Sequence, residues 1–305
     1  MKISIITVCK NSEIFIERSI QSVISQTYEN IEYIIIDGAS GDRTCELINK
    51  YANHIDIFKS EPDRGLYEAM NKGIKIATGD FIYFLNSDDC LFDRDVLKDV
   101  AQTISTYDIC DFLYGNVERI NISGESFMSK SPKPESLKEE MIISCAIPHQ
   151  GSFFKANLFK KLGYFNEMYR IAADYEWFTK LLQDPNLKLI LSDRIIASYY
   201  CGGLSGINLK LAYSEMFDAQ NKSGLFDSKD AETRIHKFQE LCIEQQDLIG
   251  KLQTLSQVRH EYATETKNQL DACLNLANER LIMIESTAWG KLIILFKKAV
   301  KKLKK

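Results

Sequence analysis

Several features that mark particular protein classes are missing from this sequence of 305 residues. The eight cysteines are scattered and none forms a C-x-x-C pair, so a zinc site or a thioredoxin-like motif has no support. No stretch reaches the roughly 18 apolar residues that a membrane-spanning helix needs. The net charge of −4 excludes a nucleic-acid binder that works by overall charge. We expect a globular protein without a signal peptide, in a reducing compartment.

Proline and glycine are scarce in the last third of the chain. Pro185 is the last proline, and Gly250 is the only glycine between residues 230 and 285. Because these residues break helices, their scarcity predicts long helices over residues 226–286. Apolar residues recur there at heptad-like spacing, including Phe238, Leu241, Leu248, Leu252 and Leu255. Self-association through a coiled coil over residues 230–285 and helices folded back on the rest of the chain both fit this pattern.

The final segment, residues 287–305, lacks acidic residues and holds seven lysines. As a helix it would carry Trp289, Phe296 and further apolar residues along one side. A basic amphipathic helix of this kind lies in a membrane interface with its lysines on anionic lipid. We therefore expect a cytoplasmic protein attached peripherally to the inner face of the cell membrane. A helix that binds a protein partner is the alternative.

The first hundred residues instead alternate short apolar runs with helical patterns. The expected strands are residues 2–8, 31–37, 54–61 and 80–86, and the expected helices between them are residues 12–26, 42–52 and 65–77. This alternation predicts an α/β fold, with a mostly parallel sheet sandwiched by helices. Such sheets bind ligands at the carboxyl ends of their strands. The second half adds a predicted hairpin over residues 111–129, a helix at 172–184, a strand at 188–200 and a glycine loop at 201–208.

Two adjacent carboxylates, Asp88 and Asp89, follow the predicted strand at residues 80–86. Like charges so close together repel unless a cation lies beside them, and Mg²⁺ or Mn²⁺ prefers such hard oxygen ligands. The other interpretation is an N-cap for a helix that begins near Asp93. Thr7 and Asp37 also end predicted strands, so we expect these polar side chains at one edge of the sheet.

With these segments the sequence resembles the family 2 glycosyltransferases, which have the nucleotide-sugar-binding GT-A fold. The resemblance rests on SIITVCKN, SIQSVISQTYENIEYIIIDGASGDRT, DRGLYEAMNKGIKIATGDFIYFLNSDD and ADYEWFTKL, in this order. The third segment looks most like bacterial enzymes that build O-antigen and capsule repeat units. The resemblance implies a catalytic domain over residues 1–225, with a nucleotide-binding half at 1–110 and an acceptor half at 111–225.

The resemblance also implies roles for single residues. Asp37 would accept a hydrogen bond from N3–H of uracil, Thr7 would border the base, and Arg64 would meet the base or the phosphates. Asp88 would touch the ribose directly or through a metal. Asp89 would bind the Mn²⁺ or Mg²⁺ ion that neutralises the departing pyrophosphate.

A sugar hydroxyl needs a base that takes its proton before it can attack. The resemblance places this base at Asp174, and Glu176 is the second candidate because Ala173 replaces an acid often found there. His149 would contact the diphosphate, the metal or the acceptor; a packed loop residue is the other interpretation. The glycine loop at 201–208 would close over the donor, or it is an ordinary loop.

These features predict an inverting glycosyltransferase. It would move a sugar from a UDP-sugar to a hydroxyl of a lipid-linked saccharide in surface polysaccharide synthesis. The chain lacks the Gln-x-x-Arg-Trp motif of processive members, so we expect one sugar per event. Two alternatives remain, a nucleotidyltransferase and a catalytically dead scaffold that acts through the helical tail. A nucleotidyltransferase would usually carry a glycine-rich phosphate loop after the first strand, and none is seen there.

Overall fold

The computed structural model describes residues 1–121, 124–142, 144–203 and 208–226. Segments 226–286 and 287–305 lie outside these ranges, apart from Phe226, so the coiled coil and the amphipathic helix stay predictions. Among the described residues, no helix is long and apolar enough to cross a membrane.

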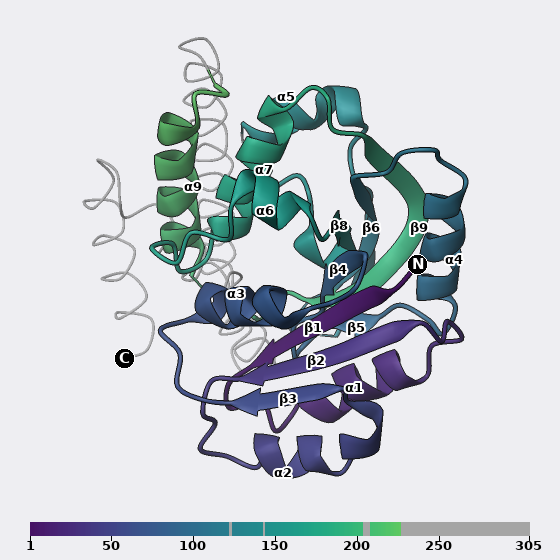
Figure 1. Cartoon of the computed structure of the whole chain (residues 1–305). Helices are drawn as coiled ribbons and strands as arrows, with labels where there is room; N and C mark the ends of the chain where they lie inside the picture. The colour runs from purple at the N-terminus through teal and green to yellow at the C-terminus, as the bar shows by residue number, and fades with distance from the viewer. Residues whose placement is uncertain (122–123, 143, 204–207, 227–305) are drawn as a thin grey trace, which may run out of the picture.

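One sheet runs through the molecule in the strand order β3-β2-β1-β4-β8-β6-β9-β5, and β7 pairs with β6 (Figure 1). Strands β1 to β4 are parallel to one another. Their bounds are β1 Ile3–Cys9, β2 Ile31–Asp37, β3 Ile57–Ser60 and β4 Phe81–Phe84. The intervening helices are α1 (Ile16–Ile24), α2 (Thr44–Asn49) and α3 (Leu66–Ile76), with a 3-10 turn η1 (Ala52–His54) before β3. The predicted alternation of the first half is confirmed.

The second half extends the sheet with strands of both directions. β8 (Ser152–Lys155) pairs antiparallel with β4 and with β6 (Phe112–Ile120), whereas β9 (Leu189–Tyr200) runs parallel to β6. β6 and β7 (Ser126–Ser129) form the predicted hairpin, and β5 (Cys90–Leu91) pairs with β9. The other helices are α4 (Val96–Ser105), α5 (Leu137–Met141), α6 (Leu158–Leu162), α7 (Ala173–Gln183) and α9 (Leu209–Ser223), with 3-10 turns η2 (Pro134–Ser136) and η3 (His149–Gly151).

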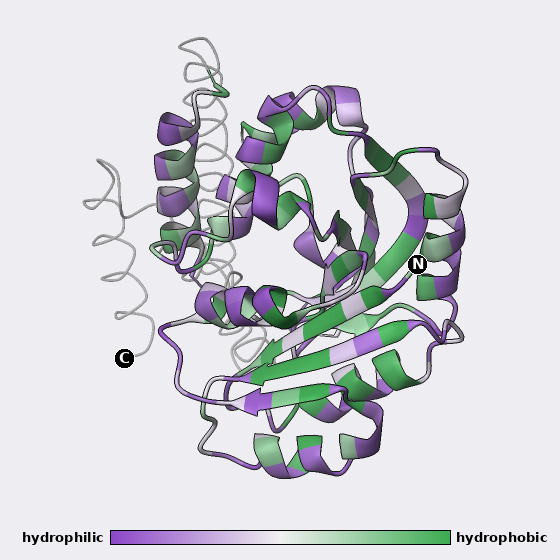
Figure 2. Cartoon of the chain, in the orientation of Figure 1, coloured by the Kyte–Doolittle hydropathy of each residue, from purple (hydrophilic) through white to green (hydrophobic). Residues whose placement is uncertain are grey.

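Alternation along the strands builds one apolar core on each face of the sheet. Ile6 and Ile34 belong to the core that also contains residues of α3, α6 and α7. Ile5 directly precedes Ile6, and Ile35 directly follows Ile34. Both belong to the opposite core, which contains residues of α1, α2 and α4. Successive side chains of a strand point to opposite faces, so strands that are apolar throughout need helices on both sides. Figure 2 shows the green apolar strands between helices that also carry polar surface.

An aromatic cluster fixes the position of helix α7. Trp177 is fully buried, and its ring centroid lies 5.2 Å from that of Phe154 and 5.1 Å from that of Phe159. Its indole N–H donates to the carbonyl of Gly163 over 2.8 Å, so the buried polar group is satisfied. The first turn of α7 carries Asp174, which is therefore held on a rigid element.

The carboxyl ends of the parallel strands meet at one edge of the sheet, as predicted. Cys9 lies beside Asp37, and Asp37 lies beside Ser60. β8 runs in the opposite direction, so it begins at the edge where β4 ends. This antiparallel pairing brings η3, which precedes β8, next to Asn86, which follows β4.

Candidate functional site

A cavity of about 770 Å³ opens at this edge of the sheet. One wall is formed by the loops that follow β1 and β4 and by the start of α3. The other wall is formed by the ends of β6 and β9, by η3, by the start of α7 and by α9. The cavity thus joins the two halves of the chain, and its volume falls in the range of pockets that enclose small ligands.

A chain of hydrogen bonds links Asp174, His149 and Asn86 within the cavity. The Nδ1 atom of His149 lies 3.0 Å from Oδ2 of Asp174, and its Nε2 atom lies 3.1 Å from Nδ2 of Asn86. A carboxylate oxygen accepts hydrogen bonds, so the Nδ1–H group of His149 donates to Asp174. The acid predicted as the base is therefore connected to the NSDD segment.

The second oxygen of Asp174 is also held. Oδ1 accepts a hydrogen bond of 2.9 Å from the hydroxyl of Tyr67 and one of 2.8 Å from the backbone N–H of Tyr175. The side chain of Asp174 is only 13 % exposed, yet it lines the cavity. Partners on α3, η3 and α7 thus fix the carboxylate in one orientation.

Helix α9 holds the loop that leads to Asp174. The buried carboxylate of Glu215 accepts hydrogen bonds from the backbone N–H groups of Arg170, Ile171 and Ala172, at 2.8, 2.8 and 3.0 Å. One side chain therefore satisfies three consecutive donors just before α7. This arrangement makes α9 part of the support of the site.

Glu176, the second candidate for the base, is placed differently. Its Oε1 atom pairs with Lys180 over 2.8 Å, and it does not line the cavity. Its Oε2 atom is buried and has no hydrogen-bond partner among the described residues. Of the two acids, Asp174 is the one whose carboxylate reaches the cavity.

The two adjacent carboxylates point to different places. Asp88 lines the cavity, whereas Asp89 is 1 % exposed and does not. Oδ1 of Asp89 accepts a hydrogen bond from the backbone N–H of Tyr200 at 3.1 Å, which ties the end of β4 to the end of β9. Neither acid caps the next helix, since α4 begins only at Val96.

Burial raises the pKa of both carboxyl groups above the ordinary range. For Asp89 the charge of Asp88 raises the pKa further, and hydrogen bonds from Tyr200 and Gln150 oppose the rise. For Asp88 the nearby His149 and Arg18 oppose it. A cation would stabilise the ionised form of two carboxyl groups in this environment.

The oxygen atoms around Asp88 fit a divalent cation. Oδ2 of Asp89 and Oδ1 of Asn86 are buried and have no hydrogen-bond donor among the described residues. No group of three or more acid, histidine or cysteine ligands occurs in the part of the chain that the structure describes. Mg²⁺ binds through one or two carboxylates together with substrate phosphates, so the remaining ligands would come from a nucleotide and water. A Cβ atom on Gly203 would lie 2.8 Å from Oδ2 of Asp88, so glycine leaves room there.

Asp37 and Thr7 lie at the predicted edge but behind the cavity wall. Both are fully buried, and neither lines the cavity. Asp37 accepts hydrogen bonds from the backbone N–H of Ser40 at 2.9 Å, from its hydroxyl, and from the hydroxyl of Ser60 at 2.6 Å. Burial opposes ionisation of Asp37, but these hydrogen bonds outweigh it and lower the pKa. Asp37 thus shapes the loop after β2, and its contact with a base stays a prediction.

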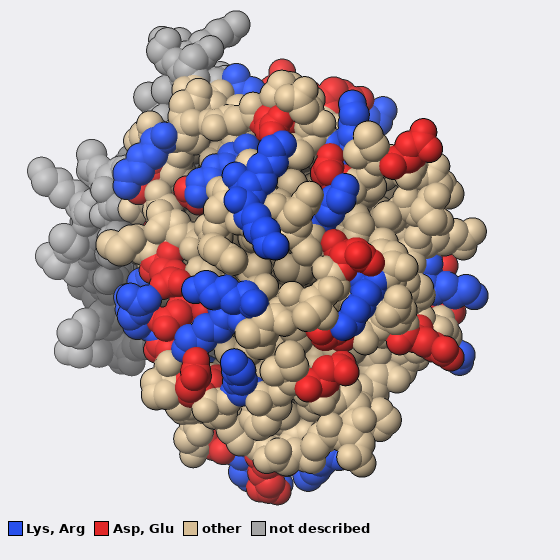
Figure 3. All heavy atoms as spheres, viewed as in Figure 1, with Lys and Arg blue, Asp and Glu red and all other residues tan. Residues whose placement is uncertain are grey.

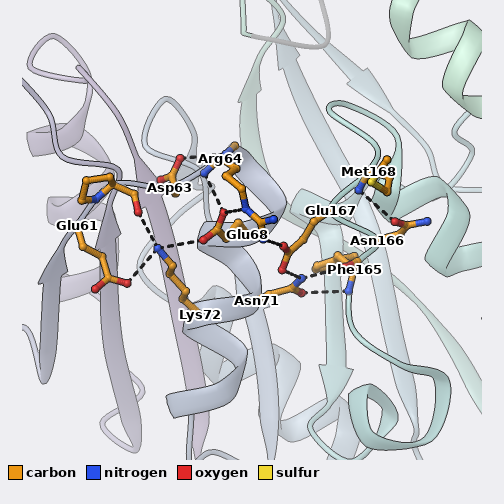
Figure 4. Close-up of polar contacts among 12 residues, drawn as sticks. Glu61, Asp63, Arg64, Glu68, Asn71, Lys72, Phe165, Asn166, Glu167 and Met168 are labelled. Atoms are coloured by element: carbon orange, nitrogen blue, oxygen red, sulfur yellow. Dashed lines mark hydrogen bonds and ion pairs between the residues drawn. The ribbon is translucent and has the colours of Figure 1, made fainter.

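Arg64 belongs to a polar cluster outside the cavity (Figure 4). Its Nε atom lies 2.6 Å from Oε2 of Glu68, and its guanidinium also pairs with Glu167. Asn71 and Phe165 exchange two hydrogen bonds of 2.9 and 3.0 Å in the same cluster, which joins α3 to the loop before α7. The predicted contact of Arg64 with a nucleotide therefore stays a prediction.

Several residues of the cavity wall are not predicted from the sequence, among them Asp63, Tyr67 and Arg119. Asp63 follows β3, so its position after a predicted strand is a signal of the same kind as for Asp37. Arg119 lies two positions beyond Val117 on β6, and residues two apart share a face of a strand. Nothing in the sequence pattern marks Tyr67, because its hydroxyl meets Asp174 only through tertiary packing.

The sequence matches the family model described as Glycosyl transferase family 2 over residues 4–164. A PGL/p-HBAD biosynthesis glycosyltransferase of Mycobacterium tuberculosis is 30% identical over 209 residues, which cover 66% of this chain and 78% of that protein. An uncharacterized glycosyltransferase of Haemophilus influenzae is 27% identical over 190 residues, 60% of this chain and 63% of that protein.

Solved structures with a similar fold include S. aureus TarS 1–349 in complex with UDP-GlcNAc, at a TM-score of 0.56 and 23% identity, over 66% of this chain and 58% of that chain. A longer TarS structure gives a TM-score of 0.58 at 20% identity over 75% of this chain, which spans 41% of that chain. The mannosyltransferase PcManGT from Pyrobaculum calidifontis, in complex with GDP-Man and Mn²⁺, gives 0.56 at 15% identity, over 99% of this chain and 86% of that chain. At these identities the likeness shows the fold alone.

Proposed function

Because the chain belongs to glycosyl transferase family 2, we propose that it transfers a sugar from a UDP-sugar to a hydroxyl group of a saccharide acceptor, with inversion at the anomeric carbon. Family, GT-A fold and enzyme class are as predicted, so the nucleotidyltransferase and the dead scaffold are set aside. One observation carries the proposal: a single cavity brings the held carboxylate of Asp174 together with the oxygen-rich edge at Asp88.

Asp174 supplies the base in this proposal. The acceptor hydroxyl donates a hydrogen bond to the carboxylate, and its proton moves there while its oxygen attacks the anomeric carbon. The bond from that carbon to the β-phosphate oxygen of the donor breaks on the opposite side, so the configuration inverts and UDP leaves. His149 and Tyr67 keep the carboxylate oriented during this step.

Asp88 faces the diphosphate in this proposal. A divalent cation bound there would neutralise the charge that develops on the leaving pyrophosphate. From the sequence, Asp89 is the leading candidate for the metal ligand. We assign that role to Asp88 because it lines the cavity, and we assign Asp89 to holding β9 at Tyr200. Complexes of similar fold with UDP-GlcNAc, and with GDP-Man and Mn²⁺, support a nucleoside diphosphate sugar as donor.

Hydrolysis of a panel of UDP- and GDP-sugars tests this function. We expect the wild-type protein to release UDP from at least one UDP-sugar in the presence of Mn²⁺, because water can replace the acceptor beside Asp174. Chelation of the metal is expected to reduce the rate strongly. Chromatography of the released nucleotide measures both effects. Hydrolysis of GDP-sugars alone, or an unchanged rate after chelation, would contradict the proposed donor or the proposed metal dependence.

We further propose that the acceptor is lipid-linked and belongs to surface polysaccharide synthesis, and that residues 287–305 attach the protein to the membrane. This proposal is supported by the seven lysines and the apolar side of that segment. Each lysine near an anionic surface contributes about 1 kcal/mol, which salt screens. We expect deletion of residues 287–305 to abolish sedimentation with phosphatidylglycerol vesicles at low salt without changing UDP affinity. Equal sedimentation of both proteins would contradict the anchor.

A further inference from the structure

Arg119 is a partly buried cation that has no ion-pair partner among the described residues. It lies near the end of β6 and lines the cavity. Its Nε atom is buried and makes no hydrogen bond with any described residue, and no carboxylate of the described ranges pairs with it. Arg43, Arg64 and Arg194, in contrast, each form an ion pair. A buried guanidinium N–H group without an acceptor costs free energy, so this position favours a ligand that brings an oxyanion.

The surroundings of Arg119 place it on the side of the proposed base. Burial raises the pKa of the Cys145 thiol, the Asp174 carboxylate adds to this rise, and the Arg119 guanidinium opposes it. Cys145 therefore lies near both charged groups. Arg119 belongs to the cavity wall that also carries Asp174, whereas Asp88 belongs to the opposite wall. Arg119 thus faces the cavity from the side of the proposed base, where an acceptor would lie.

We propose that Arg119 binds an oxyanion of the acceptor, a phosphate or carboxylate group on the saccharide that receives the sugar. The planar guanidinium can donate two parallel hydrogen bonds to either group, which fixes orientation as well as position. An anion held there sets which hydroxyl group of the acceptor reaches Asp174. This inference rests on the proposed function, since it requires an acceptor beside the base.

Calorimetric binding to the UDP-saturated protein tests the inference. The probes are the 1-phosphates of glucose, galactose, mannose and N-acetylglucosamine, methyl glucuronide, and the neutral methyl glycosides of the same sugars. We expect at least one anionic probe to bind about tenfold more tightly than its neutral counterpart. Arg119→Gln is expected to remove this preference while UDP affinity stays within about twofold. Tighter binding of a 1-phosphate would indicate a phosphate group on the acceptor, and tighter binding of the uronide would indicate a carboxylate group.

Arg119→Lys serves as the second variant, because it keeps the charge without the planar fork. It is expected to retain part of the preference, and its thermal unfolding controls for folding defects at this position. The inference fails if anionic and neutral probes bind equally to the wild-type protein, or if Arg119→Gln weakens UDP as much as it weakens the anionic probes. Absence of UDP binding to the wild-type protein would instead contradict the proposed function. In that case, titration of the anionic and neutral probes without UDP would still measure whether Arg119 binds the anion.

Discussion

Asp174→Asn is expected to lower turnover by a factor of about 10² to 10⁴, the range that a positioned general base contributes. Asparagine keeps the shape of the side chain and can still accept hydrogen bonds from Tyr67 and the backbone of Tyr175. It cannot take a proton from the acceptor hydroxyl or from water. UDP affinity is expected to stay within about twofold, because the nucleotide is proposed to bind at the other wall of the cavity. Steady-state rates of donor hydrolysis, with calorimetric titration of UDP, measure the two quantities separately.

Glu176→Gln is the matched control for that experiment. Glu176 lies on the same helix and carries the same charge, but it pairs with Lys180 and does not line the cavity. Its replacement is expected to leave turnover within about threefold of the wild-type rate. A near-normal rate for Asp174→Asn, together with a large loss for Glu176→Gln, would move the base to Glu176. A parallel loss of UDP affinity in Asp174→Asn would show that Asp174 serves binding instead.

The fold was predictable from the sequence because the strands of the first half are apolar throughout. Ile3, Ile5 and Ile6 are all completely buried, so β1 requires cover on both faces, and helices at regular spacing supply it. The second half was less predictable as a sheet. β8 inserts antiparallel between β4 and β6, and nothing in its short apolar run specifies that direction.

The candidate site was predictable where it depends on strand ends and unpredictable where it depends on side-chain direction. Asp37 and Asp88 both lie at the predicted edge, yet Asp37 is enclosed by Ser40 and Ser60 while Asp88 reaches the cavity. The apolar run of a strand indicates where that strand ends. It does not indicate which loop will fold over a carboxylate that follows it. Glu215 shows the same limit, because its contacts join segments more than forty residues apart.

The distribution of charged side chains over a face of the molecule could not be predicted from the sequence either. The sequence shows a mild excess of acid, and the face in Figure 3 carries basic side chains interspersed with acidic ones around tan surface. This arrangement depends on which strands and helices bring the charged side chains together, and the sequence alone does not show that.

Asp88→Asn is expected to remove the Mn²⁺-dependent part of UDP affinity and to lower turnover by a factor of about 10² or more, since charge stabilisation at a leaving group typically contributes this much. The amide is isosteric, so the room beside Gly203 is kept, but the negative charge that favours a divalent cation is lost. Titration of UDP with and without Mn²⁺, for both proteins, isolates the metal-dependent part.

Asp89→Asn is the adjacent comparison, and it separates the two assignments of the metal ligand. The asparagine can still accept the hydrogen bond from the backbone of Tyr200, and burial together with the charge of Asp88 already raises the pKa of Asp89 well above its ordinary range. Removing its charge is therefore expected to cost much less Mn²⁺-dependent UDP affinity than the change at Asp88. The reverse order, with Asp89→Asn losing the metal dependence and Asp88→Asn keeping it, would return the ligand to Asp89. Such a result would require the loop after β4 to turn when the nucleotide binds, because Asp89 has no access to the cavity in the structure described above.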